Sequence, residues 1–242
     1  MRALKTICML LAFFAMTSQA LAYILPAQFI MRLLADKVSR LKIEDVSMKL
    51  ESQEGSESRA ERLYLKRGER ARLVSGADET VIYVENEGKI SDLKSGTTSG
   101  RTDVLAALLF PSGKNLDERS LRSVKILESA GIDTSVVALA RLDNRPAYIV
   151  GAKFSETGKP QIWMDKELFV PVRSILFTGP DATGDKIEKR YLDYANLKAK
   201  SLESEWFPSI IKTWKNGELV KEQVIMEAKT NQKLPESLFR AP

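Results

Sequence analysis

The sequence has no histidine and a single cysteine, Cys8, among its 242 residues. The absence of histidine excludes Ser-His-Asp and Cys-His catalytic arrangements and zinc sites built on imidazole. If residues 1–22 are removed as a targeting segment, the remaining 220 residues carry no thiol. This excludes disulfides, iron–sulfur clusters and thiol catalysis. The classes that remain are chemistry by carboxylate, lysine or Ser–Lys groups, and binding without chemistry.

A strong charge of one sign is also missing. The chain carries 37 Lys and Arg against 32 Asp and Glu, a net charge of +5, and loss of Arg2 and Lys5 would lower it to +3. Charged residues of both signs make up 29% of the chain, which is unlike the one-sided basic stripe of a nucleic-acid-binding protein. We therefore expect no nucleic-acid partner.

The N-terminus has the three regions of a secretory signal peptide. Basic residues lie within Met1–Lys5, an apolar run covers Thr6–Met16, and Thr17–Ala22 ends in an Ala-x-Ala pattern. The pattern predicts cleavage after Ala22. About 11 apolar residues are too few for a membrane-spanning helix, which needs about 20. Export of a chain without cysteines in its mature part indicates a bacterial periplasm, and we expect residues 23–242 to form one domain.

The mature chain begins with one amphipathic helix. Pro26 suits the first turn of a helix, and apolar residues then recur at helical spacing up to Leu41. The helix could cover an apolar surface of the rest of the protein. The candidate residues for such a lid are Phe29, Ile30, Leu33, Leu34 and Val38.

After this helix the apolar period changes to two, which predicts β-strands. We expect a charged turn at Ser52–Arg59, a loop at Asp92–Asp103, and short helices at Val104–Phe110 and around Leu121–Leu127. The strands are predicted within residues 43–50, 62–66, 70–75, 80–85, 89–93, 136–142, 147–153, 161–164, 169–177, 187–197, 206–214 and 219–230. Asn216-Gly217 is the strongest hairpin signal. Strands joined by short connections predict a mainly β (α+β) fold, a long antiparallel meander that curls.

Several short patterns resemble catalytic motifs but lack the partners that such motifs need. Ser39–Lys42 and Ser91–Lys94 both match S-x-x-K, yet the K-T-G and S-D-N elements of penicillin-binding enzymes are absent. Gly113-Lys114 lacks the remainder of a phosphate-binding loop, and Asp181–Asp185 does not have calcium-loop spacing. We therefore expect no catalytic residue, metal or cofactor, and a carboxylate-based hydrolase is the weakest of the functional alternatives.

Aromatic and large apolar residues are concentrated in the C-terminal hairpins. Period two places Trp206, Ile210 and Trp214 on one face of their strand, and Phe207 and Ile211 on the other. A curled sheet with few helices has concave apolar surface that a ligand could fill, although both faces could instead be packed core. The candidate cavity residues are Trp163, Phe169, Ile175, Phe177, Trp206, Ile210 and Trp214.

Two C-terminal segments resemble the periplasmic outer-membrane lipoprotein carrier (LolA-like) superfamily. Ile162–Arg173 has the strand, D-K-x turn and P-V-R strand of one hairpin of that superfamily. Trp206-Phe207-Pro208, Asn216-Gly217 and the closing Asn231–Phe239 are similar to its ending. The specific match covers about residues 160–240.

This resemblance implies an unclosed antiparallel half-barrel with helices covering the concave face, where acyl chains bind. It also implies a monomeric periplasmic carrier that takes a lipid or lipoprotein acyl chain from an inner-membrane donor complex to an outer-membrane acceptor. The alternative is a regulatory or sensor protein of the same fold that binds a membrane protein, because a fold alone does not determine function.

Overall fold

The computed structural model describes residues 24–68, 70–75, 79–83, 90–92, 98–99, 104–178, 184–195 and 206–239, with only the backbone described for 79–83, 90–92, 98–99 and 195. The signal peptide predicted over residues 1–22 lies outside these ranges, as does most of the loop predicted at Asp92–Asp103.

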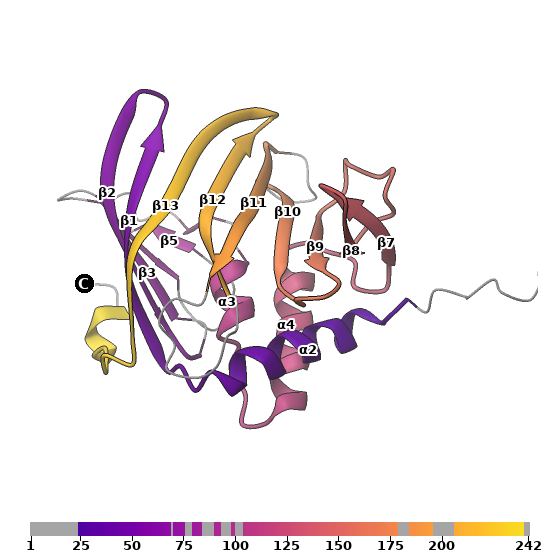
Figure 1. The fold of residues 1–242 in the computed structure, drawn as a ribbon, viewed down its shortest axis with the longest axis horizontal. Helices are drawn as coiled ribbons and strands as arrows, with labels where there is room; N and C mark the ends of the chain where they lie inside the picture. The colour runs from indigo at the N-terminus through magenta and orange to yellow at the C-terminus, as the bar shows by residue number, and fades with distance from the viewer. Residues whose placement is uncertain are drawn as a thin grey trace, which may run out of the picture.

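The described strands form one antiparallel sheet that curls without closing (Figure 1). Its order is β6-β5-β4-β3-β2-β1-β13-β12-β11-β10-β9-β8-β7, so β6 and β7 are the edges. This confirms the predicted fold class. The strands are β1 (Asp45–Glu54), β2 (Glu57–Lys66), β3 (Arg70–Ser75), β4 (Glu79–Tyr83), β5 (Ile90–Asp92), β6 (Thr98–Ser99), β7 (Val137–Leu142), β8 (Arg145–Val150), β9 (Gln161–Asp165), β10 (Pro171–Phe177), β11 (Lys186–Ala195), β12 (Phe207–Lys215) and β13 (Glu218–Thr230).

The sheet is two meanders joined at its centre. The chain runs outward from β1 to β6, crosses through helices to the opposite edge at β7, and returns to β13 beside β1. β1 and β13 pair from Val46 opposite Thr230 to Gln53 opposite Glu222, with a bulge between Lys49 and Leu50. Segments about 180 residues apart in sequence are thus hydrogen-bonded neighbours.

Within the described residues, three α-helices pack inside the curl of the sheet: α2 (Ala27–Arg40), α3 (Leu105–Leu109) and α4 (Leu116–Ser129). A 3-10 helix, η2 (Glu236–Phe239), follows the last strand. Asn115 caps the start of α4, because its side-chain oxygen accepts a hydrogen bond from the Glu118 backbone N–H and its side-chain nitrogen donates one to the Glu118 carboxylate. Arg32 on α2 pairs with Asp117 at 2.9 Å, and Arg119 donates to Ser39 at 2.7 Å, which joins the two helices.

The two faces of the sheet differ in what covers them. The inner face, which carries Val46, Met48 and Leu50 of β1, packs against the buried residues of the helices in one core cluster. The outer face carries a smaller cluster around Ile149 and Trp163. Alternation along the strands places these sets on opposite sides.

One predicted turn is wrong. Ser52–Arg59 was expected to connect two strands, but β1 continues to Glu54 and β2 begins at Glu57, with a tight turn at Gly55 (φ +59°) between them. Most side chains at this tip are exposed. The apolar alternation is therefore lost there although the backbones remain paired.

The buried carboxylate of Asp45 holds the segment that follows β13. Its two oxygens accept hydrogen bonds from the backbone N–H groups of Gln232 (2.7 Å) and Leu234 (3.1 Å), and its side chain is almost fully buried. We expect Asp45→Ala to lower the free energy of unfolding by about 2 kcal/mol, because it leaves two backbone donors without an acceptor. Urea unfolding measures this loss.

The matched control is Glu44→Ala at the neighbouring position. The Glu44 carboxylate is largely exposed and pairs with Arg67, so the expected loss is below about 1 kcal/mol. Equal losses in the two variants would contradict the role given to Asp45.

Candidate functional site

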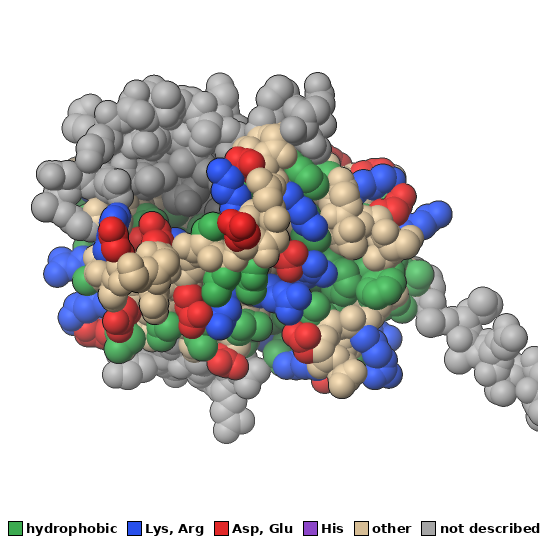
Figure 2. All heavy atoms as spheres, turned by 90° about the horizontal axis from the view of Figure 1, so that it is seen from above, with side chains coloured by type: hydrophobic (Ala, Val, Ile, Leu, Met, Phe, Trp, Pro, Cys, Tyr) green, Lys and Arg blue, Asp and Glu red, His purple; other side chains and the backbone are tan. Residues whose placement is uncertain are grey.

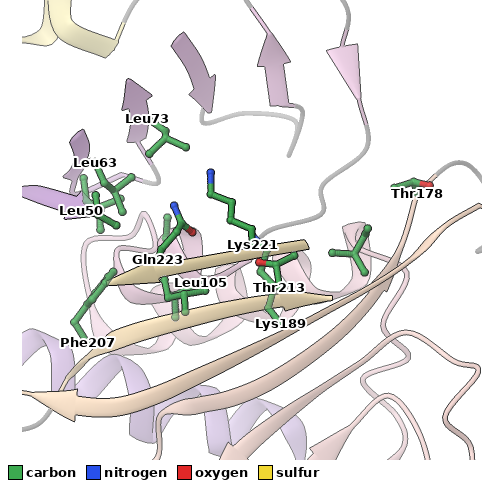
Figure 3. A pocket seen from close by; sticks show the side chains of 14 residues that line it. Leu50, Leu63, Leu73, Leu105, Thr178, Lys189, Phe207, Thr213, Lys221 and Gln223 are labelled. Carbon is green, nitrogen blue, oxygen red and sulfur yellow. The ribbon is translucent and has the colours of Figure 1, made fainter. Parts of the chain in front are cut away.

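A cavity of about 310 Å³ lies on the inner face of the sheet, between the β1–β3 half, the β11–β13 half and α3 (Figure 3). Nine of the fourteen described residues that line it are hydrophobic. The lining residues are Leu50, Leu63, Leu65, Leu73, Leu105, Ala106, Thr178, Ile187, Lys189, Phe207, Ile211, Thr213, Lys221 and Gln223.

Strand register brings these side chains together. Leu63 and Leu65 are two residues apart on β2 and therefore share its inner face. On the other half, Ile211 lies opposite Tyr191 of β11 and Gln223 of β13. Leu105 comes from α3, between the two halves of the sheet in the sequence. The cavity thus depends on contacts between segments that are distant in the chain.

One side of the cavity is polar. We call Thr213, Lys221, Gln223 and the buried Glu61 the polar wall. Glu61 lies opposite Leu50 on the inner face, and its carboxylate accepts hydrogen bonds from the Lys221 ammonium (2.6 Å) and the Gln223 amide nitrogen (2.6 Å). The Glu61 side chain is only 1% exposed, so this charge has an ion pair and a hydrogen bond in place of water. The cavity therefore combines an apolar floor with a fixed polar edge.

None of the seven predicted cavity residues is among the described residues that line this cavity. Trp163 belongs to the outer cluster, and Ile210 and Trp214 alternate with the cavity residues Ile211 and Thr213. Trp206 is fully buried and packs edge-on against Phe110 and Phe207.

The other three candidates lie on or before β10. Ile175 is fully buried, Phe177 is half-buried, and Phe169 packs partly buried against the main core from a left-handed turn position (φ +52°). Phe207 and Ile211 do line the cavity. The alternation along the strand could have identified them, because they lie on the face opposite to Ile210 and Trp214.

On the outer face, Trp163 and Trp214 are connected through three charged side chains that lie between their rings. The Arg173 guanidinium lies over the Trp163 ring at 5.3 Å and pairs with both Glu188 oxygens at 2.9 Å. Arg190 also contacts Glu188 and lies 5.6 Å from the Trp214 ring. These contacts give Trp163 and Trp214 structural partners on the face away from the cavity.

Burial by itself would raise the pKa of Glu188, but hydrogen bonds and charge from Arg173, with a further contribution from Arg190, outweigh it and lower the pKa below the ordinary 4.5. A carboxylate with a lowered folded-state pKa stabilises the fold above its unfolded pKa, and this stability is lost as the pH falls. We expect Glu188→Gln to cost about 1 kcal/mol at pH 7.

The difference in unfolding free energy between wild type and Glu188→Gln should shrink as the pH is lowered from about 5 to about 3. Urea unfolding at a series of pH values measures it. A difference that stayed constant over this range would show that Glu188 does not act through its charge.

The predicted lid residues lie on α2, and three of them face the core. Ile30, Leu34 and Val38 are buried, whereas Leu33 is half-buried and Phe29 is 46% exposed. None of the five is among the described lining residues of the cavity, where the helical contribution comes from Leu105 and Ala106 of α3.

A second cavity, of about 370 Å³, lies beside the turns that follow β7 and β9 and beside the last residues of β11. Its main polar groups already have partners within the chain. Asp165 pairs with Arg145 at 2.9 Å and accepts two backbone N–H groups of its own turn, and the Tyr194 hydroxyl donates to the Pro171 carbonyl. Burial raises the pKa of Tyr194 well above its ordinary value, so the hydroxyl remains a donor. These contacts fix the D-K-x turn and leave this cavity the weaker ligand site.

The remaining sequence patterns have structural contacts or lie outside the described residues. Ser39 of the first S-x-x-K pattern accepts a hydrogen bond from Arg119, and the second pattern extends into residues that are not described. Within the described ranges no three His, Cys, Asp or Glu residues are grouped to hold a metal ion. No helix in that part of the chain is long and apolar enough to cross a membrane. On the face seen in Figure 2, basic and acidic side chains are interspersed.

No family model and no curated protein matches the sequence. Among solved structures, a LolA superfamily protein from Nitrosomonas europaea superposes with a TM-score of 0.50 at 12% identity, over 89% of this chain and 98% of that one. A candidate outer membrane lipoprotein-sorting protein domain from Vibrio parahaemolyticus gives 0.48 at 13% identity, over 87% and 95%. The MucA/MucB complex of Pseudomonas aeruginosa gives 0.31 at 15% identity, over 89% and 61%.

At these identities the likeness concerns the fold. The open antiparallel sheet with helices inside its curl is the architecture implied by the hairpin and C-terminal motifs. The chain thus has the fold of a LolA superfamily protein.

Proposed function

We propose that the protein is a periplasmic carrier that binds a lipid or lipoprotein acyl chain in the inner-face cavity and transfers it towards the outer membrane. The observation that carries this proposal is the cavity itself, with its apolar floor of Leu50, Leu63, Leu73, Phe207 and Ile211. Its volume is at the lower end of the range for small-molecule pockets, about 300–1,000 Å³. The N-terminal export pattern and the shared fold agree with this role.

The physical basis of binding is burial of methylene groups. Each methylene that leaves water contributes about 0.8 kcal/mol, and no directional chemistry is needed along the chain. A carrier must also release its cargo, so moderate burial in a cavity with open sides suits transfer from an inner-membrane donor to an outer-membrane acceptor. We infer that the mature protein is the single domain of residues 23–242 and acts by binding, without catalysis.

The test is native mass spectrometry on protein expressed with its own N-terminus in a bacterial periplasm and purified without detergent. The mass of residues 23–242 is expected, together with adducts that fragment into phospholipid or acylated peptide. A clean apo mass that is unchanged after incubation with acyl lipids would overturn the carrier proposal. It would favour the regulator that binds a membrane protein.

We further propose that α2 is a movable part of the cover. Its described polar links to α4 run through Arg32 and Ser39, and both contacts could open on partial release of the helix. Hydrogen exchange should show less protection in α2 than in β12 and β13 of the free protein, and a gain on addition of an acyl lipid. Equal protection of α2 and the central strands, with and without lipid, would rule out this motion.

A further inference from the structure

The polar wall has hydrogen-bonding capacity that the protein itself does not use. The Lys221 ammonium has three N–H donors, and its described partners are Glu61 at 2.6 Å and Glu54 at 3.1 Å. A carboxylate only accepts hydrogen bonds, so the Gln223 amide must turn its nitrogen to Glu61. Its carbonyl oxygen then has no donor among the described residues. One donor and one acceptor are therefore available to a ligand.

The register places these groups in two adjacent cross-strand rows. Lys189, Thr213 and Lys221 are directly opposite one another on β11, β12 and β13. The next row contains Ile211 and Gln223, with Ser52 of β1 opposite Gln223 on its other side. Figure 3 shows the Lys221 and Gln223 side chains extending from their strand into the cavity.

Ser52 is a second, independent sign of unmet hydrogen bonding. Its residue is 2% exposed, and its hydroxyl has no hydrogen-bond partner among the described residues. Buried hydroxyl groups nearly always have partners. Next to Gln223, this hydroxyl extends the zone in which a polar ligand atom would be stabilised.

The Lys221 ammonium is already paired with two carboxylates, Glu61 at 2.6 Å and Glu54 at 3.1 Å. An anionic head group would have to compete with Glu54 and Glu61 for Lys221. An uncharged group that accepts one hydrogen bond and donates another meets no such competition.

We propose that the polar wall recognises the uncharged polar end of the acyl ligand, in which a carbonyl group lies beside an N–H or O–H donor. Acyl amides and acylglycerols share this chemistry. The carbonyl accepts from Lys221, the ligand donor meets the Gln223 carbonyl oxygen, and the acyl chain lies along the apolar floor. This assignment rests on the proposed acyl-binding function and adds the head-group class to it.

The test compares four C12 ligands by calorimetry at concentrations at which each is fully dissolved and not aggregated. N-lauroylethanolamine and monolauroylglycerol carry the carbonyl and a donor, methyl laurate lacks the donor, and laurate is anionic. We expect the first two to bind about tenfold more tightly than the others. The preference should disappear in Lys221→Met/Glu61→Gln, which removes both charges together, and weaken in Thr213→Val, which keeps the shape of the side chain.

The matched control is Lys212→Met/Glu222→Gln. This pair is 2.9 Å apart on β12 and β13 but on the outer face, so its loss should leave the preference unchanged. Equal binding of all four ligands, tighter binding of laurate, or a preference that survives in Lys221→Met/Glu61→Gln would overturn the head-group assignment and leave the carrier proposal standing. Failure of every ligand to bind wild type would overturn both.

Discussion

Ile211→Trp is expected to weaken acyl-ligand binding by about fifty-fold while the protein remains folded. Ile211 lies on the inner face of β12 and lines the cavity. An indole there occupies space that the acyl chain needs. If it displaces about three methylenes, the loss is about 2.4 kcal/mol, which is about fifty-fold in Kd. Titration calorimetry with monolauroylglycerol measures the change.

The control is Ile210→Trp, one residue earlier on the same strand. Ile210 lies on the other face of β12 and is not among the described lining residues. A tryptophan at this position should leave the Kd within about twofold of wild type. If Ile210→Trp abolished binding and Ile211→Trp did not, the ligand site would lie on the outer face, where Trp214 is.

Ile210 and Ile211 also show which part of the site the sequence pattern could not predict. Alternation assigned Trp206, Ile210 and Trp214 to one face of β12 and Phe207 and Ile211 to the other. This division holds for Ile210 and Trp214, but it is wrong for Trp206, which precedes β12 and belongs to the main core cluster with Phe207 and Ile211. Both sets are apolar, so the pattern cannot tell which of them faces the helices. That choice depends on how the whole sheet curls around α2, α3 and α4.

Local signals predicted the strands and turns well. Asn216 and Gly217 both have positive φ (50° and 93°), as the two-residue turn of a hairpin between β12 and β13 requires. β3 was predicted with its observed bounds, Arg70–Ser75. Neighbouring residues are sufficient to specify this turn and this strand, and contacts with distant segments only stabilise them further.

The polar wall could not be predicted in the same way. Glu61 occurs in a stretch with Glu57, Arg59 and Arg62, and such a run of charges is typical of a solvated strand. Its partner Lys221 is 160 residues away in the sequence. Only the pairing of β1 with both β2 and β13 brings the two together on the inner face. The sequence contains no local sign of this contact.

The same ion pair gives the largest expected effect on stability. Lys221→Met should lower the free energy of unfolding by about 3 kcal/mol, because it leaves the buried Glu61 carboxylate without its cation. Gln223 would still donate one hydrogen bond to that carboxylate. Urea unfolding of the free protein measures the loss.

Addition of Glu61→Gln to Lys221→Met should restore most of the lost stability, because no uncompensated buried charge then remains. The interaction energy of the double-mutant cycle separates the pair from other effects of each substitution. The same cycle on Lys212 and Glu222 should give less than about 1 kcal/mol, since both side chains are about one-third exposed.

Additive losses at Glu61 and Lys221 would mean that the two groups do not act as a pair. In that case the orientation of Lys221 in the cavity would need another cause. Strong coupling would instead mean that the buried Glu61 carboxylate holds the Lys221 ammonium at the cavity edge.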